Sequence, residues 1–187
     1  MRTRSLVLRT AAELFAAKGF RETSINEVAE RMQMTKGAVY HHFPSKEILA
    51  ISVVEVHYER WPALLTEVRA EGLSPMDTAI TLLNRVTEAF CNDPIVQAGA
   101  RLQLERSLID APLPTPYVGW TDILSDLFHA AQEAGQLREG IAPQQAARTV
   151  IAAFFGTQHI SDTLHQRADL LERWHETRDL LFLAIRA

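Results

Sequence analysis

The chain has 187 residues, of which 47% are hydrophobic and 22% charged, with eight glycines and eight prolines. This composition is typical of a globular protein of one or two domains and excludes collagen-like, low-complexity and disordered chains. The one cysteine, Cys91, excludes an internal disulfide and a zinc site built from cysteines. Neither a signal-peptide pattern nor a stretch apolar enough to span a bilayer is visible, so we expect a cytoplasmic protein.

The net charge of −4 is unevenly distributed along the chain. Residues 1–50 contain eight basic and five acidic side chains and therefore carry +3, which leaves −7 on residues 51–187. All three lysines lie in the first of these segments. A basic end on an acidic protein indicates that a polyanion contacts the N-terminal part. Ordinary scatter in composition gives an imbalance of this size as well.

Apolar residues recur at helical spacing, and no β-alternating run of useful length is visible, so we predict an all-α protein of about nine helices. In the first 50 residues, one helix ends at Gly19, the next begins with the capping box Ser24 and Glu27, and a short third helix follows Thr35. Three helices with a short connection between the last two outline a helix-turn-helix unit. Val39 in the short helix is expected to face the core.

Six further helices are predicted after this unit. They extend approximately over 46–71, 75–91, 95–109, 117–134, 143–165 and 169–186. Pro62 lies inside the first of them and predicts a kink or break near Trp61, because proline removes a backbone donor. Three prolines between residues 111 and 116 predict a loop. We expect a helix-turn-helix domain over 1–46 and a larger helical domain over 47–187.

Residues 35–47 read T-K-G-A-V-Y-H-H-F-P-S-K-E. This stretch resembles the end of the DNA-binding domain of TetR-family transcriptional regulators. The resemblance covers most of the first 50 residues. It implies a homodimeric regulator without enzymatic activity, whose C-terminal helical domain binds a small molecule. From the residues themselves we expect no cofactor, no metal and no membrane partner. Gln33 stands where the family often has a turn glycine, so positive φ is expected at a non-glycine residue.

A recognition helix in the major groove needs small side chains at its start, so that the backbone approaches the bases, and donors aimed at phosphates. The helix after Thr35 has both properties. The candidate DNA contacts are Thr23, Ser24, Thr35, Lys36, Gly37, Ala38, Tyr40, His41 and Lys46. Three of them have simpler interpretations: Tyr40 as a cover for the core edge, Lys46 as a solvated charge, and Ser24 as a helix cap.

A second resemblance is scattered over about 65 residues. Asp93-Pro94-Ile95-Val96, the segment 99–102, the proline-rich loop, Trp120 and Gly156-Thr157 are similar to the γ-butyrolactone-receptor branch of the family. That branch senses butyrolactones, butenolides or related furans and represses secondary-metabolite genes. In it, a tryptophan at the position of Trp120 belongs to the ligand pocket.

Apolar positions of the C-terminal part, together with polar side chains inside apolar stretches, are the candidate ligand contacts. They are Leu82, Arg85, Val86, Phe90, Gln103, Trp120, Leu124, Leu127, Phe128, Phe155 and Gln158. A solid core without a pocket gives the same apolar spacing.

Apolar stripes on the last two helices are candidates for the dimer interface, since a twofold-symmetric operator requires two DNA-binding domains. They are Ala147, Val150, Phe154, Leu170, Trp174 and Leu181, although such stripes also fill a subunit's own core. The sequence thus predicts a repressor that releases a palindromic operator on binding a small signalling molecule. The alternatives are a TetR-type sensor of drugs or fatty metabolites controlling an efflux or catabolic gene, and a small helical enzyme with a vestigial motif.

Overall fold

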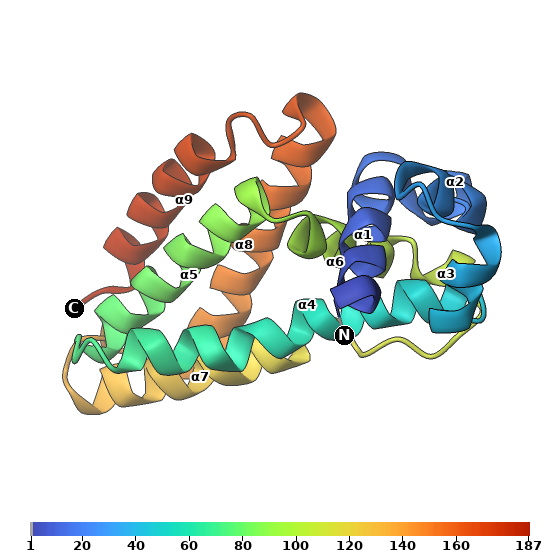
Figure 1. Ribbon diagram of the computed structural model, residues 1–187. Helices are drawn as coiled ribbons and strands as arrows, with labels where there is room; N and C mark the ends of the chain where they lie inside the picture. Colours follow the sequence, from blue (N-terminus) through green and yellow to red (C-terminus); the bar gives the residue numbers. More distant parts are fainter. Residues whose placement is uncertain (1) are drawn as a thin grey trace. The chain divides into compact units, whose positions relative to one another are not determined.

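The computed structural model describes residues 2–187, and these residues form nine α-helices and one short 3₁₀ turn (Figure 1). The predicted all-α class is confirmed. The helices are α1 Arg2–Glu22, α2 Ile25–Arg31, α3 Lys36–His42, α4 Lys46–Arg69, α5 Pro75–Asn92, α6 Pro94–Leu104, α7 Val118–Glu133, α8 Pro143–His165 and α9 Leu170–Ile185, with the 3₁₀ turn η1 at Arg106–Leu108. Within the described part, no helix is both long and apolar enough to cross a membrane.

Side-chain caps fix the starts of the short helices, as the sequence predicts. The Ser24 hydroxyl accepts from the amide of Glu27 at 3.2 Å at the start of α2. The Thr35 hydroxyl accepts from the amide of Ala38 at 3.2 Å at the start of α3. Each cap satisfies a backbone donor that has no partner inside its helix. Each of these two helices therefore begins at the residue that its local sequence predicts.

The turn between α2 and α3 contains the expected left-handed residue. Gln33 has a φ of 54°. Its amide donates to Glu30 O at 3.0 Å, and the amide of Met34 donates back to Ala29 O at 2.9 Å. The turn is therefore closed by backbone hydrogen bonds even though a side chain occupies a conformation that favours glycine.

Two predicted elements differ from the structure. α4 stays helical from Lys46 to Arg69 with Pro62 inside it, so a break near Trp61 does not occur, and a kink there stays a prediction. Pro62 is exposed and removes a single backbone donor, which one turn of a long helix tolerates. α6 ends at Leu104, earlier than expected, because Glu105 leaves helical geometry and η1 follows.

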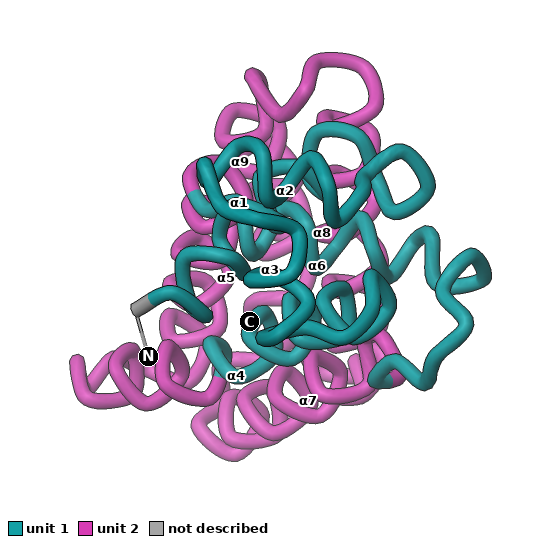
Figure 2. The backbone as a smooth tube through the Cα atoms, turned by 45° about the vertical axis from the view of Figure 1, so that its right-hand side comes forward, with its two compact units in different colours: residues 1–61, 93–114 teal, residues 62–92, 115–187 magenta. Residues whose placement is uncertain are grey.

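By packing, the chain divides into two compact units (Figure 2). Unit 1 consists of the residues up to 61 together with 93–114, and unit 2 of 62–92 together with 115–187. These limits differ from a division after residue 46, because the first part of α4 and all of α6 pack with the N-terminal helices. The predicted helix-turn-helix domain is thus one part of a larger compact body.

α6 is a structural component of unit 1. It packs along α1, and its residues Ala98 and Leu102 belong to the same buried cluster as Phe15, Val39 and Phe43. Burial of this continuous apolar cluster is the main stabilising contribution within the unit. A segment more than 50 residues away along the chain therefore supports the helices of the N-terminal motif.

Replacing Gln33 with glycine should stabilise the protein. Glycine adopts positive φ without the steric penalty of a Cβ, so we expect Gln33→Gly to raise the free energy of unfolding by about 1 kcal/mol. Urea denaturation followed by circular dichroism measures the change. Glu30→Gly, at an exposed position in the last turn of α2, is the matched control and should lower stability. Equal destabilisation by both substitutions would contradict the strain assigned to Gln33.

Candidate nucleic-acid interface

The short helix α3 presents a polar outer face. Thr35, Lys36 and His41 are exposed, and Tyr40 is 38% exposed. Val39 between them is completely buried, as predicted. α3 therefore carries its candidate DNA contacts on the outside and is anchored by one apolar side chain.

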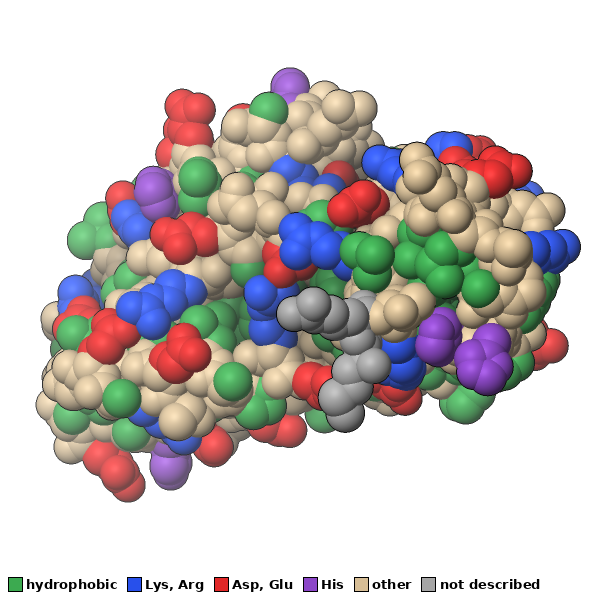
Figure 3. Space-filling view, viewed as in Figure 1, with side chains coloured by type: hydrophobic (Ala, Val, Ile, Leu, Met, Phe, Trp, Pro, Cys, Tyr) green, Lys and Arg blue, Asp and Glu red, His purple; other side chains and the backbone are tan. Residues whose placement is uncertain are grey.

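Two cations near this face lie over aromatic rings. The Lys36 ammonium is 5.6 Å from the centroid of the Tyr40 ring, and the Arg4 guanidinium is 4.9 Å from that of Phe43. Such contacts favour one position of a flexible cationic side chain. On the face drawn in Figure 3, acidic and basic side chains are interspersed and do not form one large patch of a single sign.

A groove of about 430 Å³ lies next to α3, where the first residues of α2 and α4 meet. Its lining residues are Arg21, Glu22, Thr23, Ser24, Ile25, Tyr40, Pro44, Ser45, Lys46 and Glu47. Ser24 caps α2, and the Ser45 hydroxyl accepts from the amide of Ile48 at 3.2 Å at the start of α4. Two helix N-termini beside one groove favour an anion there, such as a backbone phosphate.

An acidic residue at this groove is already held in its ionised form. Backbone hydrogen bonding at the start of α4, and then the Ser45 hydroxyl, lower the pKa of Glu47 from its ordinary value. Ser45 is not among the DNA contacts predicted from the sequence. Its place in the groove depends on the folding of α4 against α2, which local spacing does not specify.

Two of the candidate residues are directed inward. The Thr23 side chain is buried, and its hydroxyl donates to Gly19 O at 2.8 Å, so it does not offer the predicted hydroxyl to DNA. The Lys46 ammonium donates to Phe20 O at 2.9 Å and lies 4.3 Å from the centroid of the Phe20 ring. Both side chains hold the end of α1, because the carbonyl groups there have no partners within the helix.

Packing within the chain does not explain why residue 37, in the first turn of α3, is a glycine. Apart from its chain neighbours and the backbone of its own helix, a Cβ built on it would meet no atom of the described residues within 4 Å. Glycine inside a helix is unfavourable by about 1 kcal/mol relative to alanine. An exposed glycine at this position therefore fits a backbone that another molecule approaches closely.

Comparison with known proteins identifies this arrangement. The profile of bacterial regulatory proteins of the tetR family matches residues 7–53, and that of the tetracyclin repressor-like C-terminal domain matches residues 73–187. The second match alone covers more than half of the chain. The chain belongs to the TetR family. This is a family of DNA-binding transcriptional regulators and not of enzymes, so the expectation of a non-enzymatic regulator is confirmed.

Three similar proteins narrow the relationship. The A-factor receptor protein of Streptomyces griseus is 29% identical over 164 residues, which are 88% of this chain and 56% of that protein, so this chain spans little more than half of that relative. A protein whose structure was solved to explain the control of antibiotic production by bacterial hormones is 57% identical, with a TM-score of 0.94. The match covers 100% of this chain and 99% of that chain. CprB from Streptomyces coelicolor, solved with its operator DNA, is 25% identical with a TM-score of 0.82, over 98% of this chain and 88% of that one.

The candidate ligand contacts fall into two groups. Gln103 lies in unit 1, and the other ten lie on α5, α7 and α8 of unit 2, where α7 packs against both other helices. Eight of these ten are buried, and Phe155 is half-buried against the exposed Tyr117, with ring centroids 4.8 Å apart. Arg85 pairs with Glu71 at the surface. Burial is also what a solid core requires, so the role of these residues as ligand contacts stays a prediction.

Five of the six candidate dimer residues are buried inside one subunit. They are Ala147, Val150, Phe154, Leu170 and Trp174. Their surface is already covered by the same chain, so they offer no contact area to a second copy. Leu181 is half-buried. Helical periodicity identified the apolar faces of α8 and α9 but did not distinguish the face that packs internally from the one left outside.

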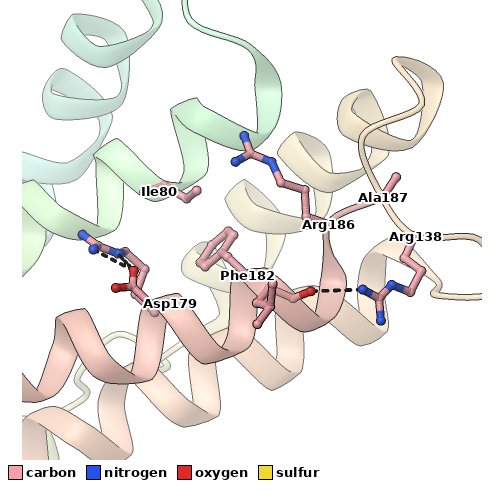
Figure 4. A pocket seen from close by; sticks show the side chains of 8 residues that line it. Ile80, Arg138, Asp179, Phe182, Arg186 and Ala187 are labelled. Atoms are coloured by element: carbon pink, nitrogen blue, oxygen red, sulfur yellow. Dashed lines mark hydrogen bonds and ion pairs between the residues drawn. The ribbon is translucent and has the colours of Figure 1, made fainter.

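Unit 2 also contains a pocket of about 420 Å³ that the sequence did not predict (Figure 4). Three arginines converge on it, but each is already engaged: Arg178 with Asp179, Arg186 with Asp77, and Arg138 with Leu183 O at 3.1 Å. These bonds hold the last described residues against α5 and the segment before α8. The described residues contain no group of three or more histidine, cysteine or acidic side chains placed to hold a metal ion.

Replacing Gly37 with alanine should move stability and DNA affinity in opposite directions. We expect Gly37→Ala to stabilise the fold by about 1 kcal/mol through helix propensity. We also expect it to weaken binding to an operator duplex selected by the purified protein from random-sequence DNA, because a methyl group then separates the backbone from DNA. Thermal unfolding and fluorescence anisotropy measure the two effects.

Gly119→Ala is the matched control, because Gly119 also lies in a first helical turn with no described atom within 4 Å of its Cβ position. This control should gain stability and keep full operator affinity. Unchanged affinity in Gly37→Ala would remove the start of α3 from the interface.

Proposed function

We propose that this protein is a cytoplasmic homodimeric repressor that holds a palindromic operator and releases it on binding a small signalling molecule. The ligand class is a γ-butyrolactone, butenolide or furan, and the controlled genes belong to secondary metabolism. The 57% identity to a protein studied for hormonal control of antibiotic production supports this proposal. The similarity to an A-factor receptor supports it further.

The observation that carries the ligand response is the buried amide of Gln103 on α6. Its side chain is 7% exposed, and its nitrogen donates to the Tyr58 hydroxyl at 3.1 Å and to Pro114 O at 3.0 Å. Its oxygen, Oε1, has no hydrogen-bond partner among the described residues. A buried polar atom without a partner is unfavourable by about 1–3 kcal/mol. A ligand hydroxyl that donates to Oε1 would remove this penalty.

His57 adds a second buried polar group to the same cluster. Its ring lies 5.1 Å from that of Tyr58, and its Nδ1 is buried without a hydrogen-bond partner in the described part of unit 1. Burial, and then the neighbouring Arg60, lower the pKa of His57 to about 4, so the imidazole is neutral at physiological pH. A cluster of neutral imidazole, phenol and amide groups favours a compact ligand that carries hydroxyl groups.

Exposed leucines and an isoleucine on the last two helices support a homodimer. Leu180 and Leu183 on one face of α9 are 70% and 74% exposed. Ile160 and Leu164, one turn apart on α8, are also exposed. Large apolar side chains exposed in neighbouring positions mark contact surfaces. We therefore assign the dimer contact to these positions rather than to the buried stripes.

Removing the Gln103 amide should desensitise the repressor. We expect Gln103→Leu to keep operator affinity and to require about five- to tenfold more ligand for release, since one buried hydrogen bond to the ligand is lost. The measurement is release of the selected operator duplex by a panel of hydroxylated γ-butyrolactones, butenolides and furans. Gln97→Leu on the same helix is the control and should respond as wild type.

The panel also includes a cationic drug and a long-chain fatty acid. Release by either of these instead of the lactones, butenolides or furans would overturn the proposed ligand class. Wild-type sensitivity of Gln103→Leu would place the ligand elsewhere.

Charges on the exposed face of α9 should separate the subunits. We expect the double variant Leu180→Asp, Leu183→Asp to sediment as a folded monomer, because two carboxylates lose hydration on association. Its operator affinity should fall by at least about a hundredfold as the second half-site contact is lost. Leu73→Asp, at another exposed leucine, should remain a dimer. A dimeric double variant would move the interface away from this face.

A further inference from the structure

The connection between α1 and α2 is where the strongest unassigned feature lies. Gly19 interrupts α1 with a φ of 80° and a ψ of −178°. Helical hydrogen bonding is broken there, so the carbonyl groups before the break and the amide after it need other partners. The orientation in which α2 leaves α1 depends on how these groups are held.

Two charged side chains, Arg101 on α6 and Glu105 at its C-terminal cap, supply both kinds of partner. The Arg101 guanidinium donates from Nη1 to Ala16 O and Ala17 O, each at 3.0 Å. The Glu105 carboxylate accepts from the amide of Phe20 at 2.6 Å. The two side chains also bond to each other, from Nε of Arg101 to Oε1 of Glu105 at 3.0 Å. The cation thus caps the negative end of the first helical segment, and the anion takes the free amide that follows.

Gly19 permits this contact in two independent ways. Its positive φ lies in the region that glycine adopts without strain. A Cβ at this position would also overlap the Glu105 carboxylate. The carboxylate therefore rests directly against the backbone at the break, and no larger residue leaves it there.

The same break is linked to both helices that flank the groove. Thr23, just before α2, donates to Gly19 O at 2.8 Å, and Lys46, at the start of α4, donates to Phe20 O at 2.9 Å. An ion pair between Lys18 and Glu27 joins the end of α1 to α2. Any shift of residues 19–21 therefore changes the position of α2 and of α3, which packs against it.

We propose that Arg101 and Glu105 are positioning residues for DNA binding: they hold the α1–α2 break in the geometry that presents α3 to the operator. The assignment rests on the proposed function, and it states how ligand binding at α6 would affect α3 within unit 1. Gln103, the proposed ligand contact, lies between these two residues on α6. A ligand that displaces Gln103 moves α6, withdraws the pair from the break and thereby lowers operator affinity.

The sign of the effect separates this role from simple electrostatics. Removing a carboxylate from a DNA-binding unit reduces repulsion of phosphates and by itself strengthens binding. Loss of the positioning contact weakens binding instead. We expect Glu105→Ala to bind the selected operator duplex about tenfold more weakly while keeping its helical circular dichroism and dimer mass. Glu55→Ala, an exposed carboxylate on α4 in the same unit, is the matched control and should bind as well as wild type or better.

Three further measurements complete the experiment. Glu105→Gln retains an oxygen for the Phe20 amide and should lie between wild type and Glu105→Ala, which keeps the test decisive if the alanine variant folds poorly. Arg101→Ala combined with Glu105→Ala should weaken binding no more than either single change, because both act on one contact. Amide hydrogen exchange over residues 20–31 without DNA should be faster in Glu105→Ala than in Glu55→Ala.

Operator affinity in Glu105→Ala that equals or exceeds that of wild type overturns the proposal. Exchange in residues 20–31 that is unchanged by Glu105→Ala overturns it as well, and this readout needs neither DNA nor ligand. Failure of the wild-type protein to bind any duplex refutes the proposed function instead, so the two failures are distinguishable.

Discussion

Apolar packing of α6 along α1 is the constraint on which the rest of unit 1 depends. Ala98 and Leu102 are completely buried in the cluster that also contains the side chains anchoring α2 and α3. A helix that is distant in the sequence is thereby part of the core beneath α3, which carries the proposed DNA contacts. Its polar side chains, Arg101, Gln103 and Glu105, are consequently placed by the core rather than by local turns. A change in the position of α6 and a change in the position of α3 are therefore not independent.

Local chemistry made a large part of this fold predictable. Ser24 and Thr35 cap their helices, Gly19 interrupts the first, and Gln33 adopts positive φ, all as short-range patterns indicate. These features depend on hydrogen bonds and steric limits within about four residues. Pro62 is an exception to this local predictability. The sequence shows that a backbone donor is missing there, but not that an exposed turn of a long helix continues without it.

Long-range partners were the part that sequence reasoning missed. Thr23 and Lys46 have the right chemistry for phosphate contacts, and the structure instead directs both to the carbonyl groups at the end of α1. Trp174 lies on an apolar stripe, and the structure buries it within its own subunit rather than leaving it for a partner. This outcome depends on which neighbouring helices cover the stripe. Helical periodicity gives the face of a helix but not the identity of what packs on it. The partners of polar side chains require the tertiary arrangement for the same reason.

Two glycines, Gly19 and Gly37, occupy different surroundings and are explained by different causes. Gly19 is required by its own chain, since its backbone is left-handed and the Glu105 carboxylate fills the space of a Cβ. Gly37 is helical with open space around it, so nothing in the described chain explains why a better helix former is absent. Gly119 is helical and equally unpacked, so open space alone does not mark a contact. What distinguishes Gly37 is its place at the exposed start of α3, within the segment that the tetR-family profile matches, and duplex DNA is the contact that we propose for it.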